Sequence, residues 1–142
     1  MDRLTLALLT FDVGVPAASP DAFADRVCAQ VREAWDDGAD LVVLPEFLWM
    51  GLEPFVAGED KLRGVAQLFW TDLWPRLAPR LAQADKGVVL GTVPFLGADG
   101  QLRNRAPIWD GVAFRHQDKL HLTPWESAFV GGDGVGLWSF RG

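Results

Sequence analysis

The stretch that decides the fold is Leu41-Val42-Val43-Leu44-Pro45-Glu46-Phe47-Leu48. Its first four residues are aliphatic and predict a strand buried on both faces, as in a parallel sheet. Pro45 cannot donate a backbone hydrogen bond, so the strand should end there and place Glu46 at the carboxyl edge of the sheet. Ligands bind at that edge in open α/β sheets. The apolar residues that follow should limit the hydration of Glu46 and make its protonation state adjustable.

The residues before this stretch predict a first strand and a helix. Residues 4–11 are mostly apolar, which indicates another buried strand. Ser19 and Pro20 are typical of a helix N-cap and first helical position, and the apolar spacing of three to four continues until Gly38. Cys28 lies on this helix and should be a packed small side chain, because neither histidine is near it. The two strands should therefore be parallel, with a right-handed crossover between them.

A second helix is predicted after this stretch, followed by a third strand. Glu59 and Asp60 suit the opening of a helix, where acidic side chains interact favourably with the helix dipole. Pro75 and Pro79 should break or kink the helical segment. Residues 87–95 are again largely apolar and predict the third strand.

Two Asp-Gly pairs, at 99–100 and 110–111, predict tight hairpin turns. The chain should therefore change from parallel crossovers to an antiparallel meander. Pro107 should lie at an edge or a bulge, since proline lacks the donor that a central strand needs. Three further strands are expected, at residues 102–109, 112–117 and 135–140.

The composition predicts one globular domain covering residues 1–142. A net charge of −6 argues against a nucleic-acid partner, because phosphate binding needs clustered Lys and Arg. The single cysteine excludes a disulfide within the chain and suits a reducing compartment. No apolar stretch approaches the roughly 18 residues of a membrane span. We therefore expect a cytoplasmic protein without a membrane partner.

Glu46 and Lys119 form a candidate catalytic pair, because each follows a predicted strand and the fold can bring both to one rim. A glutamate beside a lysine stays ionised at neutral pH and can take a proton from a nucleophile. The lysine can stabilise the negative oxygen of a tetrahedral intermediate. Such a pair catalyses acyl transfer when a nucleophile joins it. The alternative is that Glu46 only caps a backbone group or makes a structural ion pair.

Two motifs resemble the nitrilase, or carbon–nitrogen hydrolase, superfamily. They are Leu-Val-Val-Leu-Pro-Glu-Phe at 41–47 and Asp-Lys-Leu-His-Leu-Thr-Pro-Trp-Glu at 118–126. The resemblance implies that Glu46 is a general base and that Lys119 stabilises the intermediate. It also implies that Glu126 helps to position the lysine and the substrate.

The same resemblance implies a fold and a reaction. The family fold is an αββα sandwich, so this α/β chain should form its first half, a mixed sheet with two helices. Asn104 is similar to a structural asparagine of the family. Family members carry a nucleophilic cysteine on a strand just after the one expected at 135–140, and Cys28 cannot replace it. We therefore expect a hydrolase of amides or nitriles with a Glu-Lys-Cys mechanism, whose cysteine lies outside these 142 residues, and no cofactor or metal.

Two other functions fit the same residues. The chain could be a non-catalytic small-molecule-binding or regulatory subunit, or one chain of a split hydrolase. Half a sandwich leaves an apolar sheet face uncovered, which favours association. We therefore expect a homo-oligomer or a partner chain, and poor solubility of the isolated chain.

Several aromatic residues near the motifs have two interpretations. Trp49 and Trp125 either line an acyl pocket or fill the core. His121 should orient its loop rather than take part in chemistry, and His116 should be structural. Together with Asp118 these histidines do not supply the ligands of a closed metal site.

Overall fold

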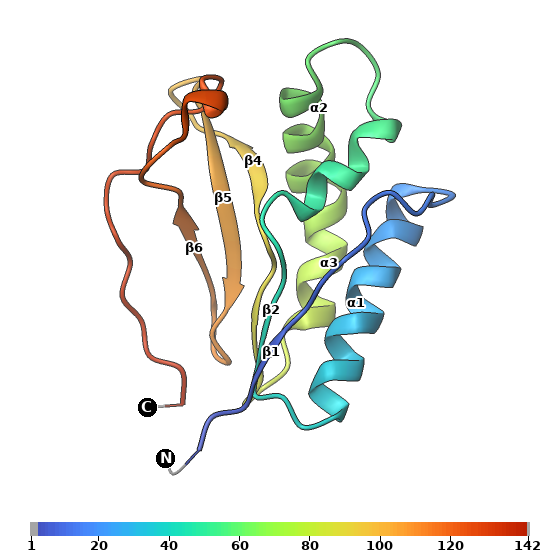
Figure 1. Ribbon diagram of the computed structural model, residues 1–142, viewed down its shortest axis with the longest axis vertical. Coiled ribbons are helices and arrows are strands. Elements are labelled where there is room, and N and C mark those ends of the chain that lie inside the picture. The colour runs from blue at the N-terminus through green and yellow to red at the C-terminus, as the bar shows by residue number, and fades with distance from the viewer. Residues whose placement is uncertain (1–2, 142) are drawn as a thin grey trace.

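The computed structural model describes residues 3–141 and shows a mixed sheet with its helices on one side (Figure 1). The predicted α/β architecture is confirmed, whereas the expected domain ends at Met1 and Gly142 lie outside the described residues. The sheet has the order β1-β2-β3-β5-β4, and β6 pairs with β5. The strands are β1 (Leu6–Leu8), β2 (Leu41–Val43), β3 (Gly87–Val89), β4 (Val93–Leu96), β5 (Leu102–Trp109) and β6 (Phe114–Asp118).

Helix α1 (Pro20–Asp36) joins β1 to β2, as predicted. The Ser19 side chain accepts a hydrogen bond from the Ala22 N–H at 3.1 Å, and Gly38 has a φ of +99° just after the helix. Strands β1 and β2 are parallel. Cys28 lies on the buried face of this helix, and burial raises the pKa of its thiol.

Strand β1 is buried on one face only, so the prediction of two buried faces is wrong for it. Leu6 and Leu8 are 50% and 74% exposed, while Ala7 packs against the core. The reason is that the helices cover a single side of the sheet (Figure 1). The opposite side of β1 therefore presents apolar side chains to solvent.

The second predicted helix is one helical rod in three segments. Helix α2 (Lys61–Gln67) is followed by a π-helical turn (Leu68–Leu73) and by α3 (Trp74–Leu81). Asp60 caps its start, as its side chain accepts from the Arg63 N–H. Of the predicted break or kink, the break does not occur at Pro75, because the rod continues through it. Pro75 occupies the first turn of α3, where a missing backbone N–H is tolerated. The π-helical turn that directly precedes it has i→i+5 hydrogen bonds in place of the regular i→i+4 bonds.

Pro79 does not break the rod either. It lies inside α3 and is followed by only two further helical residues, since the helix ends at Leu81. None of the described helices combines the length and apolarity needed to cross a membrane.

The strand predicted at residues 87–95 is divided at Gly91 into β3 and β4. Gly91 has a φ of +65°, and a Cβ placed on it would lie 2.2 Å from the Pro45 carbonyl oxygen. Only glycine combines this backbone conformation with so close an approach. The chain therefore bends where it passes the end of β2.

The two predicted hairpins are confirmed, because β4 pairs with β5 and β5 with β6, both antiparallel. Pro107 lies within strand β5, opposite a bulge. The register changes between the pairs Val89↔Ile108 and Val93↔Arg105, so residues 90–92 oppose only residues 106–107, and the predicted bulge is confirmed. The Pro107 carbonyl accepts from the Leu90 N–H, beside the bend at Gly91. In an antiparallel ladder, the C=O and the backbone nitrogen of one residue point toward the same neighbouring strand. The nitrogen of Pro107, which has no hydrogen to donate, therefore faces the interruption between β3 and β4.

Residues 135–140 form no strand, contrary to prediction. Among the described residues this segment finds no strand partner, and the Gly136 N–H donates instead to the Gln117 side chain. Residues of high strand propensity form a strand only when a neighbouring strand supplies backbone hydrogen bonds, and this segment has no such neighbour among the described residues.

Trp49 belongs to the core between helices and sheet. Of the two roles considered for it, core packing is therefore correct and lining a pocket is not. Its side chain is fully buried, its Nε1 donates to the Leu90 carbonyl at 2.8 Å, and its ring lies 4.7 Å from that of Phe69. Buried indole rings with a satisfied N–H anchor neighbouring elements. This contact holds the segment after β2 against β3.

Candidate active site

Glu46 follows the end of β2, where Pro45 was predicted to place it. The next residue, Phe47, has a φ of +57°, a conformation that is rare for a bulky side chain. The Phe47 N–H donates to the Thr92 hydroxyl at 2.8 Å, which holds this turn against the strand segment after β3. The backbone around Glu46 is therefore fixed by a long-range contact.

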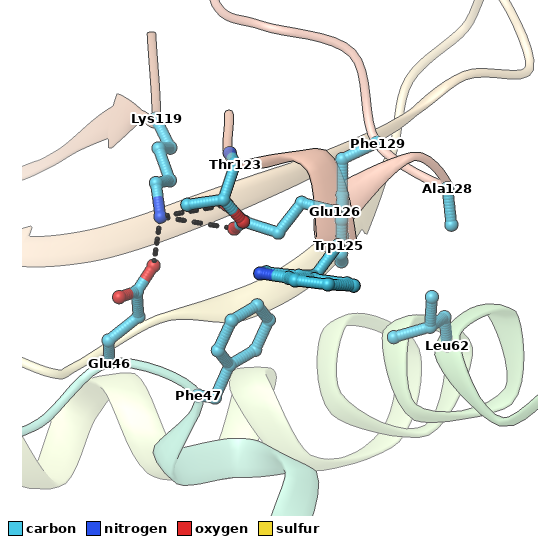
Figure 2. Close-up of a pocket in the computed structure, with 9 residues that line it drawn as sticks. All are labelled: Glu46, Phe47, Leu62, Lys119, Thr123, Trp125, Glu126, Ala128 and Phe129. Carbon is cyan, nitrogen blue, oxygen red and sulfur yellow. Dashed lines mark hydrogen bonds and ion pairs between the residues drawn. The ribbon is translucent and has the colours of Figure 1, made fainter. Parts of the chain in front are cut away.

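The structure brings Glu46, Lys119 and Glu126 together (Figure 2). The Lys119 ammonium donates to Glu46 Oε1 at 2.9 Å and to Glu126 Oε1 at 3.1 Å. Lys119 directly follows β6, and its backbone is held on both sides. Its N–H donates to the Asn104 carbonyl, and its own carbonyl accepts from the Gly132 N–H, each at 2.9 Å.

Glu126 is buried in a short 3-10 turn (Pro124–Glu126), where it forms a capping box. The backbone N–H and the hydroxyl of Thr123 donate to its Oε2 at 2.8 and 2.9 Å. The Thr123 N–H, followed by the Lys119 ammonium, lowers the pKa of Glu126 to about 2. Glu126 is therefore a carboxylate at neutral pH.

Lys119 is held as an ammonium. Its hydrogen bonds to Glu46, and then to Glu126, raise its pKa above the ordinary value of lysine. One cation thus lies between two carboxylates. Its ammonium can donate a further hydrogen bond to an oxygen that approaches it.

Glu46 is more hydrated than predicted, because its side chain is 48% exposed. Leu48 and Trp49 turn into the core instead of covering it, and only Phe47 stays beside it in the hollow. Both hydrogen bonds to its carboxylate go to Oε1, so Oε2 is the oxygen turned away from Lys119 (Figure 2).

Asn104 contacts Glu46, which the resemblance to a structural asparagine did not predict. It lies in β5, is 1% exposed, and its Nδ2 donates to Glu46 Oε1 at 2.9 Å. Its Oδ1 is buried and meets no donor within the described part of the chain. Thr123 was not predicted as part of the site, although its spacing of three before Glu126 is the signature of a capping box.

Glu46 and Lys119 separate two hollows. The larger has a volume of about 460 Å³ and is lined on its other walls by Phe47, Leu62, Trp125 and Phe129, among others. The smaller measures about 280 Å³ and is lined by Val89, Ala106 and Gln117, among others. Val89 alternates with the buried Val88 and Leu90, so the smaller hollow lies on the sheet face away from the helices.

The remaining candidates take different places. Trp125 is 91% exposed and lines the larger hollow, unlike Trp49 in the core. His116 and His121 are exposed, and Asp118 accepts two hydrogen bonds from the Arg105 guanidinium. No group of three or more His, Cys, Asp or Glu residues within 3–141 is arranged to hold a metal ion.

This arrangement suits acid–base chemistry at a carbonyl or nitrile carbon. A partly exposed carboxylate can take a proton from a nucleophile that reaches it. The adjacent ammonium can donate to the oxygen or nitrogen that becomes negative during attack. A nucleophile is the one component that these side chains do not supply.

No protein-family model matches this chain, and no curated protein matches it. Solved structures do match, and they define the class of fold: the chain has the fold of nitrilase-superfamily amidases and of the corresponding part of NAD⁺ synthetases. The fold predicted from the two motifs is thereby confirmed.

The NitN amidase of Nesterenkonia sp. AN1 is 21% identical with a TM-score of 0.68, over 98% of this chain and 55% of the amidase. A variant of that amidase carries acrylamide added to its active-site cysteine; it is 19% identical with a TM-score of 0.63 over the same shares. The glutamine-dependent NAD⁺ synthetase of Acinetobacter baumannii, with bound ADP, is 19% identical with a TM-score of 0.66 over 99% of this chain.

At these identities the likeness shows the fold alone. The chain spans about half the length of the amidase and 26% of the synthetase.

Proposed function

We propose that this chain supplies the base and the lysine of a hydrolase that cleaves the carbon–nitrogen bond of a non-peptide amide or nitrile. The observation that carries the proposal is the Lys119 ammonium held between Glu46 and Glu126, in a fold shared with amidases. Glu46 is the general base, Lys119 stabilises the intermediate, and Glu126 positions Lys119.

In the first step Glu46 takes the proton of a cysteine thiol, and the thiolate attacks the amide carbon. The carbonyl oxygen becomes negative and accepts a hydrogen bond from the Lys119 ammonium. Collapse of this tetrahedral species breaks the carbon–nitrogen bond. Glu46 returns its proton to the leaving nitrogen, so ammonia or an amine departs and a thioester remains.

In the second step water attacks the thioester carbon. Glu46 takes a proton from this water, and Lys119 again stabilises the negative oxygen. The thiolate leaves and regains a proton, which releases the carboxylic acid. The Glu46 side chain is half exposed, which gives water access to the base.

Cys28 does not serve as this nucleophile. It lies on the buried face of α1, and burial raises the pKa of its thiol, which disfavours the reactive thiolate. We propose that the cysteine enters from the sheet face, through the smaller hollow beside Glu46. The active-site cysteine of the Nesterenkonia amidase supports a cysteine-based reaction.

The intact mass of the protein isolated from its native source is measured first, to define the full-length chain. The test is then the Glu46→Gln variant of that full-length protein. The acylation rate should fall by about 10²- to 10⁴-fold, the usual contribution of a general base. Glu53→Gln is the matched control, since Glu53 is exposed and lies outside both hollows. Near-normal turnover in the Glu46 variant would refute the assignment.

Two other outcomes identify the alternatives. Saturable amide binding without turnover in the presence of every natural partner chain would indicate a binding or regulatory subunit. Activity that appears only after a second, cysteine-bearing chain is added would indicate a split hydrolase.

A further inference from the structure

The larger hollow has one charged end and one apolar end. Figure 2 shows Glu46 and Lys119 at one end, and Leu62 of α2 facing Ala128 at the other. Its volume of about 460 Å³ is in the range of small-molecule pockets. A molecule that places a reacting carbon at Lys119 therefore extends along apolar side chains toward Leu62.

Aromatic rings form the walls between these ends. The indole of Trp125 lies across the hollow from the Phe47 ring (Figure 2), and the Phe47 and Phe129 rings are 6.0 Å apart. Trp125 is almost fully exposed, which is unusual for so large an apolar ring. An apolar ligand lying against it would remove this surface from water.

The charged end has a net negative charge, which disfavours an anionic ligand. Lys119 is shared by two carboxylates, so the cluster carries a net charge of −1. The pKa of Glu126 is held at about 2, so this charge persists at neutral pH.

The cations on neighbouring elements are also engaged. Arg63 pairs with Asp60, Arg103 with Asp99, and Arg105 with Asp118. Lys61 of α2 donates to the Val56 carbonyl. A carboxylate placed at the apolar end would lose hydration without gaining a partner.

We propose that the larger hollow holds the acyl group of the substrate and selects neutral, apolar acyl groups, aromatic or branched, over acyl groups that bear a carboxylate. This rests on the proposed function, because it takes the charged end as the reacting end. Leu62 is the residue that sets this preference at the far end.

The test measures the binding of phenylacetamide and of adipamate, the anionic monoamide of adipic acid, by calorimetry at neutral pH on the intact protein. Phenylacetamide should bind at least about tenfold more tightly, since an unpaired buried polar or charged group weakens binding by this much or more. Equal or tighter binding of adipamate would overturn the inference, as would failure of phenylacetamide to bind.

A charge introduced at the far end provides the second arm. Leu62→Lys should reverse the preference, raising the affinity for adipamate at least about fivefold and lowering that for phenylacetamide. Gln67→Lys adds the same charge to α2 outside the hollow and should change neither affinity. Equal effects of the two variants would show that a long-range charge effect, rather than the hollow, sets selectivity.

These results are independent of turnover. Loss of selectivity overturns the inference while the hydrolytic roles of Glu46 and Lys119 still stand. Selective binding together with normal turnover in Glu46→Gln would refute the catalytic proposal and leave an apolar binding site.

Discussion

Replacing Asn104→Leu separates the structural from the positioning role of this buried amide. Asn104 donates to Glu46 Oε1 at 2.9 Å, whereas its Oδ1 is buried and meets no donor within residues 3–141. Leucine has a similar size and shape but neither polar atom. The substitution therefore removes one hydrogen bond and one unsatisfied acceptor at once.

The two effects on the free energy of unfolding nearly cancel. Removing a buried, unsatisfied acceptor stabilises by about 1–3 kcal/mol, and losing a hydrogen bond to a charged group costs about 1.5–3 kcal/mol. The cost is at the lower end because Glu46 is half exposed and regains water. We expect a net change within about 1 kcal/mol. If the proposed hydrolytic function is right, turnover should also fall, because Glu46 loses a partner that holds its Oε1.

Urea denaturation followed by tryptophan fluorescence measures this change. With a slope of about 1–3 kcal/mol/M, the midpoint should move by less than about 1 M. Leu48→Ala is the control for sensitivity, since Leu48 is fully buried and its truncation should cost about 2–5 kcal/mol. A loss above about 2 kcal/mol in Asn104→Leu would refute the reasoning, because it would show that Oδ1 is hydrogen-bonded in solution.

Three further predictions follow from single contacts. Gly91→Ala should destabilise by at least about 2 kcal/mol in thermal unfolding, because it adds left-handed strain and a clash with the Pro45 carbonyl; an unchanged Tm would contradict this. Lys119→Met should raise the pKa of Glu126 from about 2, yet leave it below 4.5, since the Thr123 N–H remains; a carboxyl ¹³C titration that shows no change would exclude the ion pair. Because folding lowers the pKa of Glu126, its stabilising effect is complete above pH 4.5 and lost as the pH falls to about 2. The unfolding midpoints of the wild type and Glu126→Gln should therefore converge over that range, and a constant difference would contradict the assignment.

Local chemistry made much of the fold predictable. Pro45 ends a strand because its ring removes a donor, and Ser19 starts a helix because its hydroxyl accepts a free N–H. The Asp-Gly pairs at 99–100 and 110–111 make hairpins because glycine adopts positive φ. Each of these effects acts within a few residues, so the sequence alone determined them.

The three charged residues of the candidate site were predictable from the sequence, but the residues that hold them in place were not. The two motifs indicated that Glu46, Lys119 and Glu126 would meet, and the structure places them within hydrogen-bonding distance. The hydrogen bond of Asn104 to Glu46 joins residues 58 positions apart. No local pattern marks such a contact, because it depends on how β5 lies beside the end of β2.

Burial and strand partners were decided only by the tertiary structure. Trp49 and Trp125 are equivalent by local sequence, yet one is fully buried and the other lines an open hollow. Pro107 is tolerated in a central strand because Gly91 bends the neighbouring chain. The sequence by itself determined where strands, turns and helix caps occur, since backbone preferences are local. Which faces are covered, and which side chains meet the carboxylate of Glu46, depended on segments brought together from distant parts of the chain.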